Sequence, residues 1–347
     1  MKYRMTVCLA AVALLAACGG EGSSPPPTSG PAPAPSPSPT PTPTPIAYTT
    51  FANLTGEQVF NPICATGAQN DGSSPNYQVA NDPVDRSSLA VAFSQPRGIW
   101  TLTDPGSEPS EPDIDYTFGP ADIVGDTNGT AVVYQRSVAG SGTQRFSVRN
   151  SDADSLKLQY ARALQFVRAV APDGAVPTIL DTRCVFGVNT VAEDGLPTGR
   201  VEYGKVKILG TAVLPRSNFD DPTRRFDLVN STGSFAVDFA ASQLIVTLNL
   251  EGREIRADGS LSSTVTKIGT LVSRETYFHA EAPNGVAQTR FVGYFATDGI
   301  SGFDSFTGGF FGPKAAEAGL SFTARPDETI TGLNGTFEVS GVVLAAR

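Results

Sequence analysis

Histidine is almost missing from this sequence, since His279 is the only one in 347 residues. Acid–base schemes and metal sites that need several imidazoles are therefore excluded. The sequence also lacks a G-x-S-x-G elbow, a phosphate-binding glycine loop and a C-x-x-C pair. We therefore expect a protein that is not an enzyme, with no catalytic residue, no metal site and no cofactor.

Basic residues and long apolar runs are scarce as well. Lys and Arg number 25 against 34 Asp and Glu, so the formal net charge is −9. A chain of this charge is a poor partner for nucleic acid or for an anionic membrane surface, and we expect no nucleic-acid partner. After Leu15, no apolar stretch approaches the ~20 residues that a membrane-spanning helix needs.

The N-terminus is typical of an exported protein. Lys2 and Arg4 precede an uncharged apolar run from Val7 to Leu15. The run is too short to span a bilayer, so the pattern predicts a secretory signal peptide rather than an anchor helix.

The cleavage region consists of Leu15, Ala16, Ala17 and Cys18 and resembles the bacterial lipobox. The resemblance implies that residues 1–17 are a lipoprotein signal peptide and that Cys18 is acylated, which would tether the chain to a membrane. Gly19, in place of Asp, favours the outer membrane, with the protein on its cell-surface or periplasmic face. An ordinary signal peptide followed by a chance cysteine is the alternative.

Proline dominates the next segment. Eleven of the 27 prolines lie between Pro25 and Pro45, mostly alternating with Ala, Ser or Thr. Such a tract has no side chains to bury and favours polyproline II. We expect residues 18–46 to be a lipidated, disordered stalk that reaches roughly 80 Å at about 3.1 Å per residue. A recognition site for a proline-binding module is the less favoured interpretation.

The remainder of the chain is predicted to be all-β. Apolar residues alternate with polar ones, as at Leu244, Val246, Leu248 and Leu250, and a period of two places one strand face on a core. Asn-Gly and Asp-Gly pairs between such runs favour tight hairpins and an antiparallel barrel or sandwich. The predicted strands are 88–94, 98–103, 113–118, 130–137, 143–148, 155–168, 199–213, 232–239, 242–250, 260–268, 275–281, 286–296, 300–311, 319–325 and 335–345.

Two cysteines remain for the folded part, because Cys8 leaves with the signal peptide and Cys18 takes the lipid. An even pair in an oxidising compartment suggests that Cys64 and Cys184 form a disulfide. Two separate buried thiols are the alternative, because sequence spacing does not fix the distance between the two residues.

One late segment carries a family resemblance. It runs Gly309, Phe310, Phe311, Gly312, Pro313, Lys314, Ala315, Ala316, Glu317, Ala318 and Gly319. Pro313 stops a strand, the Ala/Glu residues favour a short helical turn, and Gly319 is expected to take the positive φ that ends that turn. The segment resembles a barrel segment of transferrin-binding-protein-B-like surface lipoproteins, although Leu320 occupies a position where that family usually has glycine.

The resemblance implies a domain organisation and a role. Residues 184–347 would form an eight-stranded antiparallel barrel, and residues 47–183 would form a β-rich handle. The protein would be an outer-membrane or surface-anchored binding lipoprotein that captures a protein or an iron- or haem-type nutrient, beside a TonB-dependent receptor. A structural or adhesive surface lipoprotein is the alternative, and a secreted hydrolase is a third, weaker one. The resemblance assigns no ligand-binding residues.

The remaining candidates have simpler explanations. Asp126 to Gly129 faintly resembles a calcium loop but is better explained as a hairpin turn. Asp113 and Asp115 alternate on one strand face and are expected to be solvated. Trp100 and the aromatic cluster of Phe303, Phe306, Phe310 and Phe311 are expected to form core or barrel wall, and His279 is expected on a wall or surface.

Overall fold

The computed structural model describes the chain from Ile46 to Arg347 with internal gaps. The predicted signal peptide, the predicted lipobox with Cys18, and the Pro-rich tract lie outside the described residues, as does Phe303. The described residues are 46–70, 76–80, 89–104, 113–126, 129–138, 142–153, 156–170, 178–214, 224–256, 258–281, 287–296, 304–326 and 337–347. Residues from Pro45 onward belong to one compact unit.

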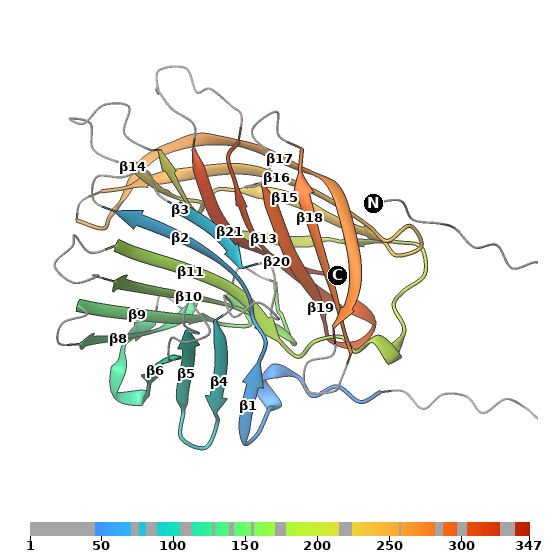
Figure 1. Ribbon diagram of the computed structural model, residues 1–347, viewed down its shortest axis with the longest axis horizontal. Helices are drawn as coiled ribbons and strands as arrows, with labels where there is room; N and C mark the ends of the chain where they lie inside the picture. The colour runs from blue at the N-terminus through green and yellow to red at the C-terminus, as the bar shows by residue number, and fades with distance from the viewer. Residues whose placement is uncertain are drawn as a thin grey trace, which may run out of the picture. The chain divides into compact units, whose positions relative to one another are not determined.

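The all-β prediction is confirmed. Every regular element of the described residues is a β-strand or a one-turn 3-10 helix, and the strand pairings among these residues are antiparallel (Figure 1). None of these helices is long and apolar enough to cross a membrane. The 3-10 helices are η1 (Phe51–Asn53), η2 (Pro120–Asp122), η4 (Ala192–Asp194) and η6 (Pro313–Ala315).

Two sheets are built from the N-terminal half of the unit. The smaller one has the order β1 (Glu57–Phe60), β4 (Ala90–Ser94), β5 (Ile99–Asp104), β6 (Ile114–Phe118). The larger one has the order β3 (Asn76–Ala80), β2 (Ile63–Asn70), β11 (Thr178–Gly187), β10 (Ala161–Val170), β9 (Gly142–Arg149), β8 (Ala131–Val138), β7 (Ile123–Asp126). Position 184, the predicted domain boundary, falls inside β11.

The third sheet is built from the C-terminal half. Its order is β12 (Arg200–Tyr203), β15 (Thr232–Asp238), β16 (Gln243–Ile255), β14 (Arg224–Asp227), β13 (Lys205–Leu214), β21 (Glu338–Ala346), β20 (Glu317–Ala324), β19 (Ser305–Phe311), β18 (Gln288–Phe295), β17 (Leu261–Glu281).

This third sheet closes on itself because β16 also pairs with β17. The ring of pairings runs β13, β21, β20, β19, β18, β17, β16, β14 and back to β13. The short strands β12 and β15 pair with each other beside the ring, and Gly204 alone separates β12 from β13. Closure removes the exposed edges that an open sheet would present. We refer to this closed sheet as the barrel.

The core of the barrel follows the alternation seen in the sequence. Leu244, Val246, Leu248 and Leu250 are all buried on β16 and pack in one cluster. Phenylalanines from β18, β19 and β20 fill the same cluster, so the predicted core role of Phe306 and Phe310 is confirmed. Phe311 is also fully buried, but it packs outside the barrel interior with Val185 and Val342.

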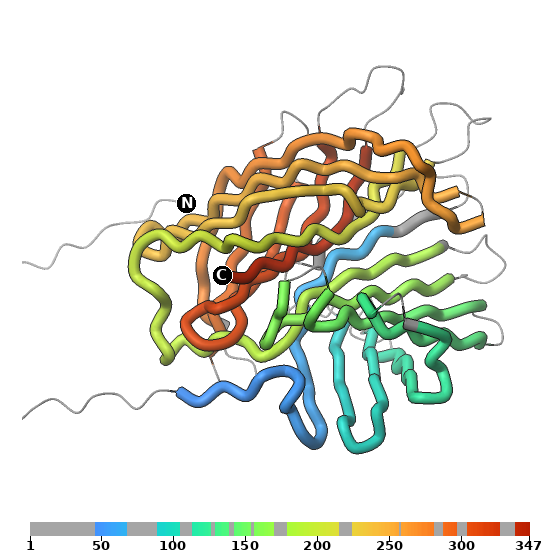
Figure 2. The backbone as a smooth tube through the Cα atoms, turned by 180° about the vertical axis from the view of Figure 1, so that it is seen from behind, coloured from blue at the N-terminus to red at the C-terminus, as the bar shows by residue number. Residues whose placement is uncertain are grey.

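The seven-stranded sheet is buried on both faces, because its side chains alternate between two cores. Even-numbered residues such as Phe146, Phe166 and Phe186 pack with the four-stranded sheet. Odd-numbered residues such as Ala163 and Val185 pack against the barrel strands β13 and β21. Figures 1 and 2 both show β2 running alongside β20 and β21 from opposite views.

Some strand boundaries differ from the predictions. β17 is a single strand of 21 residues where two were predicted, because it changes partner near Ser273, pairing first with β16 and then with β18. The predicted strand 155–168 begins only at Ala161, since Lys157 has a φ of 53° that interrupts extended backbone. The turn at Asp258-Gly259 is confirmed between β16 and β17, with a φ of 80° at Gly259.

Candidate binding cavity and the junction that supports it

An open cavity of about 450 Å³ lies beside the four-stranded sheet. Its aromatic walls come from four elements: Phe51 from η1, Phe93 from β4, Trp100 from β5 and Tyr134 from β8. Arg162 of β10 adds a positive charge. The volume falls within the roughly 300–1,000 Å³ that is usual for small-molecule sites.

The aromatic walls are held in place by one another. The rings of Phe93 and Trp100 stack with centroids 4.3 Å apart, and Trp100 also contacts Phe146 and Phe186 edgewise or tilted. Trp100 is 5% exposed, whereas Phe93 and Phe51 are half-buried and form the more accessible part of the wall. Burial raises the pKa of the Tyr134 hydroxyl, so this wall stays neutral at ordinary pH.

Arg162 is buried and stacked rather than paired with an acid. Its guanidinium lies 4.6 Å from the centre of the Phe51 ring, a cation–π arrangement. Nη1 donates hydrogen bonds to the carbonyls of Leu158 and Ala161, at 3.0 and 2.6 Å. Burial lowers the pKa of Arg162, and the charges of Glu317 and of Asp152, an acid in the cavity lining, oppose this shift. The lining contains two arginines, Arg149 and Arg162, against the single carboxylate of Asp152, so it suits a flat molecule that carries an acidic group.

Arg162 was not predicted as a site residue, although its position in β10 carries a signal. Arg162 occupies an even position in the series Leu164 and Phe166, which are buried core residues of β10. A charged residue at a core position of an alternating strand indicates a special role.

Glu317 joins the barrel to the segment just before Arg162. Its carboxylate accepts hydrogen bonds from the backbone N–H groups of Gln159, Tyr160 and Ala161, at 2.5, 3.0 and 2.7 Å. Burial raises the pKa of Glu317, and the three N–H donors oppose that shift. The carboxylate thereby fixes the chain that enters β10, which carries Arg162 into the cavity.

The glycines of the same motif permit close packing. A Cβ at Gly312 would lie 2.3 Å from Cδ2 of Tyr160, and one at Gly319 would lie 2.5 Å from Cγ1 of Val185. Gly312 has a φ of 70° and starts the turn that contains Pro313. The predicted positive φ at Gly319 is wrong: Gly319 lies inside β20, where lack of a side chain is what the contact with Val185 requires, and Lys314 and Ala315 take the positive φ instead.

The remaining motif residues lie where the pattern indicated. Gly309, Phe310 and Phe311 are the last residues of β19. Pro313 opens η6 and Glu317 opens β20, so a strand, a short helical turn and a second strand follow one another. Phe311, Gly312, Glu317 and Gly319 of the motif contact the seven-stranded sheet or the segment that leads into β10.

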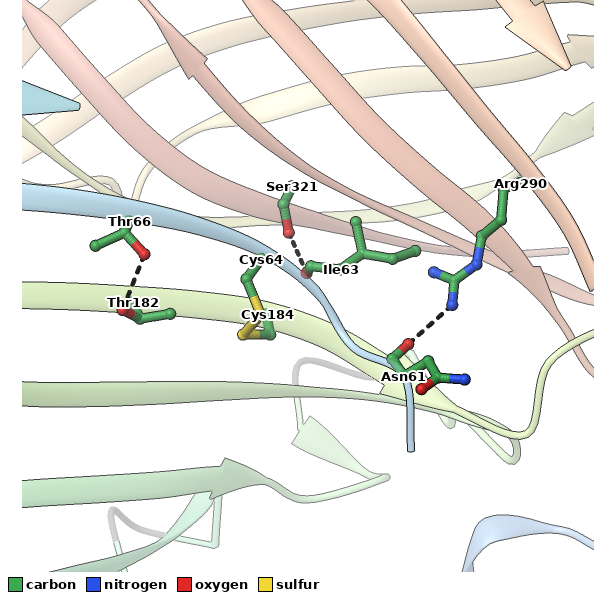
Figure 3. The surroundings of a disulfide bond; sticks show 8 residues. All are labelled: Asn61, Ile63, Cys64, Thr66, Thr182, Cys184, Arg290 and Ser321. Atoms are coloured by element: carbon green, nitrogen blue, oxygen red, sulfur yellow. Dashed lines mark hydrogen bonds between the residues drawn. A yellow bond between two sulfur atoms is a disulfide. The ribbon is translucent and has the colours of Figure 1, made fainter. Parts of the chain in front are cut away.

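Cys64 and Cys184 are bridged, and their strand is tied to the barrel. The two residues face each other in the register of β2 and β11, with sulfur atoms 2.03 Å apart. Figure 3 shows that the neighbouring carbonyl of Ile63 accepts a hydrogen bond from Ser321 Oγ at 2.5 Å. Arg290 Nη2 donates to the carbonyl of Asn61 at 2.8 Å. The disulfide therefore lies next to the junction, in the same buried cluster as the cavity residues Trp100 and Tyr134.

Of the remaining sequence candidates, Gly129 lines the cavity, whereas Asp113, Asp115 and His279 do not. Asp113 and Asp115 are exposed, and Asp115 accepts a hydrogen bond from Thr103 Oγ1 at 2.6 Å. His279 is exposed on β17, opposite Arg290. Of the loop from Asp126 to Gly129, residues 127 and 128 lie outside the described residues. Within the described part of the chain, no group of three or more His, Cys, Asp or Glu is placed to hold a metal ion.

No protein-family model matches this chain, and no curated protein matches it. Solved structures do show similarity. A double mutant of transferrin binding protein B from Haemophilus parasuis is 16% identical with a TM-score of 0.38, over 82% of this chain and 44% of that one. The isotype 1 transferrin binding protein B of serogroup B Neisseria meningitidis is 14% identical with a TM-score of 0.31, over 75% and 52%.

A third similar structure is HpuA from Kingella denitrificans, solved in complex with human haemoglobin. It is 14% identical with a TM-score of 0.29, over 83% of this chain and 88% of HpuA. This chain spans only about half the length of the transferrin binding protein B structures. By its sheet topology, the chain belongs to the class of all-β proteins that combine a closed antiparallel sheet with further antiparallel sheets.

Proposed function

We propose that this protein is a lipid-anchored binding protein of the outer membrane. In this proposal it captures a protein or an iron- or haem-type nutrient and presents it to a TonB-dependent receptor. The observation that carries the proposal is the open aromatic cavity with Arg162, on a chain whose N-terminal sequence predicts export, lipidation and a stalk.

The point where the stalk joins the folded unit supports this arrangement. The hydroxyl of Tyr48 accepts a hydrogen bond from the Val191 N–H at 3.1 Å, and its ring meets Tyr160 edge-on. Tyr160 packs on Gly312, in the turn between β19 and β20. Tyr48, just after the predicted stalk, is thus held against the turn that joins β19 to β20.

The chemistry of the cavity suggests the kind of small ligand. Stacked aromatic rings favour a flat conjugated molecule, and a buried guanidinium favours a carboxylate or another acidic substituent. A tetrapyrrole with propionate groups satisfies both requirements, so haem-type nutrients are the leading small-molecule candidates for this cavity.

Trp100 offers a direct test, because it is the only tryptophan and it lines the cavity. We would titrate the full-length lipoprotein in a neutral detergent with haemin and follow both the Soret band and Trp100 emission. Arg162→Gln is expected to weaken binding about tenfold, the loss of one charge-assisted hydrogen bond. Arg200→Gln is the control, since Arg200 is an exposed arginine paired with Glu202.

Two further measurements keep this test decisive. Phe93→Ala shortens a half-buried wall residue and should also weaken binding, while circular dichroism verifies that each variant is folded. If haemin binding fails to saturate, or if Arg162→Gln and Phe93→Ala leave it unchanged, the cavity is not a haem site. Capture of a protein would then be the part of the proposal that remains.

Capture of a protein is tested with the whole chain as bait. The immobilised lipoprotein would be exposed to growth medium or host fluid, with and without iron limitation. A deletion strain should grow more slowly when iron is supplied only as the captured protein. Normal growth of that strain under iron starvation would contradict a role in nutrient uptake.

A structural or adhesive role is the second candidate, and one surface favours it. Val272, Tyr277 and Tyr294 are exposed large side chains on neighbouring strands β17 and β18, at 43, 55 and 48% exposure. Exposed aromatic residues are frequent anchors of protein contacts. Altered surface attachment of the deletion strain, with unchanged growth without iron, would favour this role over nutrient capture.

A further inference from the structure

The N-terminal end of the described chain contributes one wall of the aromatic cavity. Residues 48–55, which we call the strap, run from just after the predicted stalk to Gly56, where β1 follows (Figure 1). The one turn of η1 is the only regular element in the strap. Gly56 has a φ of 77°, and a Cβ there would meet nothing within 4 Å. The backbone therefore has room to turn at the point where the strap meets β1.

The strap is held by separate anchors and not by a ladder of strand pairs. The Phe51 N–H donates to the carbonyl of Gln159 at 2.7 Å, and the Tyr48 hydroxyl accepts from the Val191 N–H at 3.1 Å. Phe51 and Leu54 pack partly buried against the core of the four-stranded sheet. Of the other five strap residues after Tyr48, four are exposed. A segment with so few buried contacts opens locally at a lower free-energy cost than the strands beside it.

The ring of Phe51 makes the contacts that a flat acidic ligand would make. It stacks on Phe60, with centroids 5.5 Å and planes 21° apart, and it meets Phe186 edge-on at 5.6 Å. The guanidinium of Arg162 lies against the same ring. Phe60 and Phe186 are buried, whereas Phe51 is half-buried, so Phe51 is the outermost ring of this stack. An aromatic partner beside a guanidinium is the combination that selects a flat conjugated acid.

Arg162 does not depend on Phe51 for its position. Among the described residues, its guanidinium donates hydrogen bonds through Nη1 alone, to the carbonyls of Leu158 and Ala161. The Ala161 N–H is itself bound to Glu317, so this segment stays in place when the strap moves. The face of the guanidinium that now lies against Phe51 would become accessible to an acidic group once that ring leaves.

We propose that the strap is an autoinhibitory gate, in which Phe51 occupies the ligand position and is displaced by the flat acidic molecule that binds. The inference rests on the proposed function, because it concerns the same cavity. The ligand would take over the stack on Phe60 and the contact with Arg162, and the strap would turn outward at Gly56. The apparent affinity is then reduced by the fraction of molecules in which the strap is closed. Because the strap continues into the predicted stalk, occupancy of the cavity would also change how the stalk is held.

The direction of one affinity change separates a gate from a fixed wall. Isothermal titration of the full-length lipoprotein in a neutral detergent would use haemin and 2-naphthoate, a small flat aromatic acid, each with a protein-free blank. Phe51→Ala should bind both probes at least about threefold more tightly, because the competing ring is gone. Phe93→Ala is the matched control: Phe93 lies on β4, so its loss should weaken binding. Circular dichroism verifies that both variants are folded.

Hydrogen exchange gives a second readout that does not depend on affinity. With saturating 2-naphthoate, the amides of residues 48–55 should exchange faster than in the free protein, whereas those of a fixed wall would exchange more slowly. Tyr48→Phe removes the hydroxyl that accepts from the Val191 N–H, so it should speed exchange of the strap without any ligand. Tyr277→Phe, at an exposed tyrosine of the barrel, should leave that exchange unchanged.

The outcomes distinguish the gate from the proposed function. Unchanged or weaker binding to Phe51→Ala, or slower exchange of the strap on binding, would overturn the gate and leave the cavity as a haem-type site. If haemin fails to saturate while 2-naphthoate gives the expected changes, the haem-type cargo is wrong and the gate stands. No saturable binding of either probe, by the unaltered protein or by Phe51→Ala, would overturn both.

Discussion

Gly319 of β20 lies directly against Val185 of β11, so close that a Cβ at position 319 would be 2.5 Å from Val185 Cγ1. This contact joins the barrel to the seven-stranded sheet. We expect Gly319→Ala to lower the free energy of unfolding by about 1–3 kcal/mol, because the added methyl overpacks a fully buried site. Denaturant titration measures the loss. Gly204→Ala is the matched control, since a Cβ there meets nothing within 4 Å; equal effects would contradict the close contact.

The Glu317 carboxylate should contribute more than an exposed one. Glu317→Gln keeps the shape but replaces one acceptor oxygen with a donor that faces backbone N–H groups. We expect a loss of about 2–4 kcal/mol in the free energy of unfolding, the cost of charge-assisted bonds and of unsatisfied buried donors. Glu202→Gln, at an exposed glutamate, provides the comparison. If both variants lowered the free energy of unfolding by the same amount, the three hydrogen bonds to Glu317 would make no net contribution to stability.

Reduction of the disulfide should weaken the folded chain. The bridge closes a separation of 120 residues, for which chain entropy predicts roughly 4–5 kcal/mol. Denaturant unfolding with and without reductant measures this difference, and the oxidised chain should migrate faster on a non-reducing gel. The double variant Cys64→Ala/Cys184→Ala should behave as the reduced chain and be insensitive to reductant. Identical mobility before and after reduction would show free thiols.

Stability should decrease at high pH through Tyr203. Burial raises the pKa of this hydroxyl to about 12, and the hydroxyl donates a hydrogen bond to the Ala315 carbonyl at 2.8 Å. The unfolded chain releases the proton near pH 10, so the unfolded state binds fewer protons than the folded state above that pH. The contribution is thus complete below pH 10 and is lost as pH rises toward 12.

Tyr203→Phe provides the check on that pH dependence. The variant lacks the hydroxyl, so its unfolding free energy should fall less steeply between pH 10 and 12 than that of the unaltered chain. The difference should approach about 2–3 kcal/mol, the value of two pKa units. If the unfolding free energies of the two proteins fell in parallel between pH 10 and 12, a group other than Tyr203 would cause the loss of stability at high pH.

Lipidation is tested at the single thiol that the lipobox provides. Cys18→Ala removes the acyl acceptor, so we expect the protein to move from the membrane fraction to the soluble fraction. Metabolic labelling with a fatty acid should label the unaltered chain alone. Cys8→Ala serves as control, because Cys8 lies within the predicted signal peptide. Membrane fractionation unaffected by Cys18→Ala would contradict the predicted anchor.

The sequence predicted the fold class well because the barrel strands bury one face. In β16 the even-numbered residues are buried in the core, and the odd-numbered residues are more exposed. The period of two can therefore be recognised in the amino-acid sequence. β2 and β11 were missed for the opposite reason. They lie in a sheet buried on both faces, and β2 is rich in small residues whose pattern carries no alternation.

The cavity could not be predicted, because its walls come together only in three dimensions. Phe93 and Trp100 face each other across the β4–β5 hairpin, but Phe51 and Tyr134 come from elements far from that hairpin in the chain. The motif at Gly309 to Gly319 was visible in sequence as a turn between strands. Its role as the contact surface for β10 and β11 depends on Tyr160 and Val185, which nothing in the motif itself specifies.

If the chain is exported and lipid-anchored as we propose, the bridge between Cys64 and Cys184 also affects what a secreted protease can do to it. A single cut anywhere in the chain between the two cysteines leaves both fragments covalently attached. The lipid end and the barrel would then remain one molecule, and a nicked copy would stay on the membrane instead of being shed.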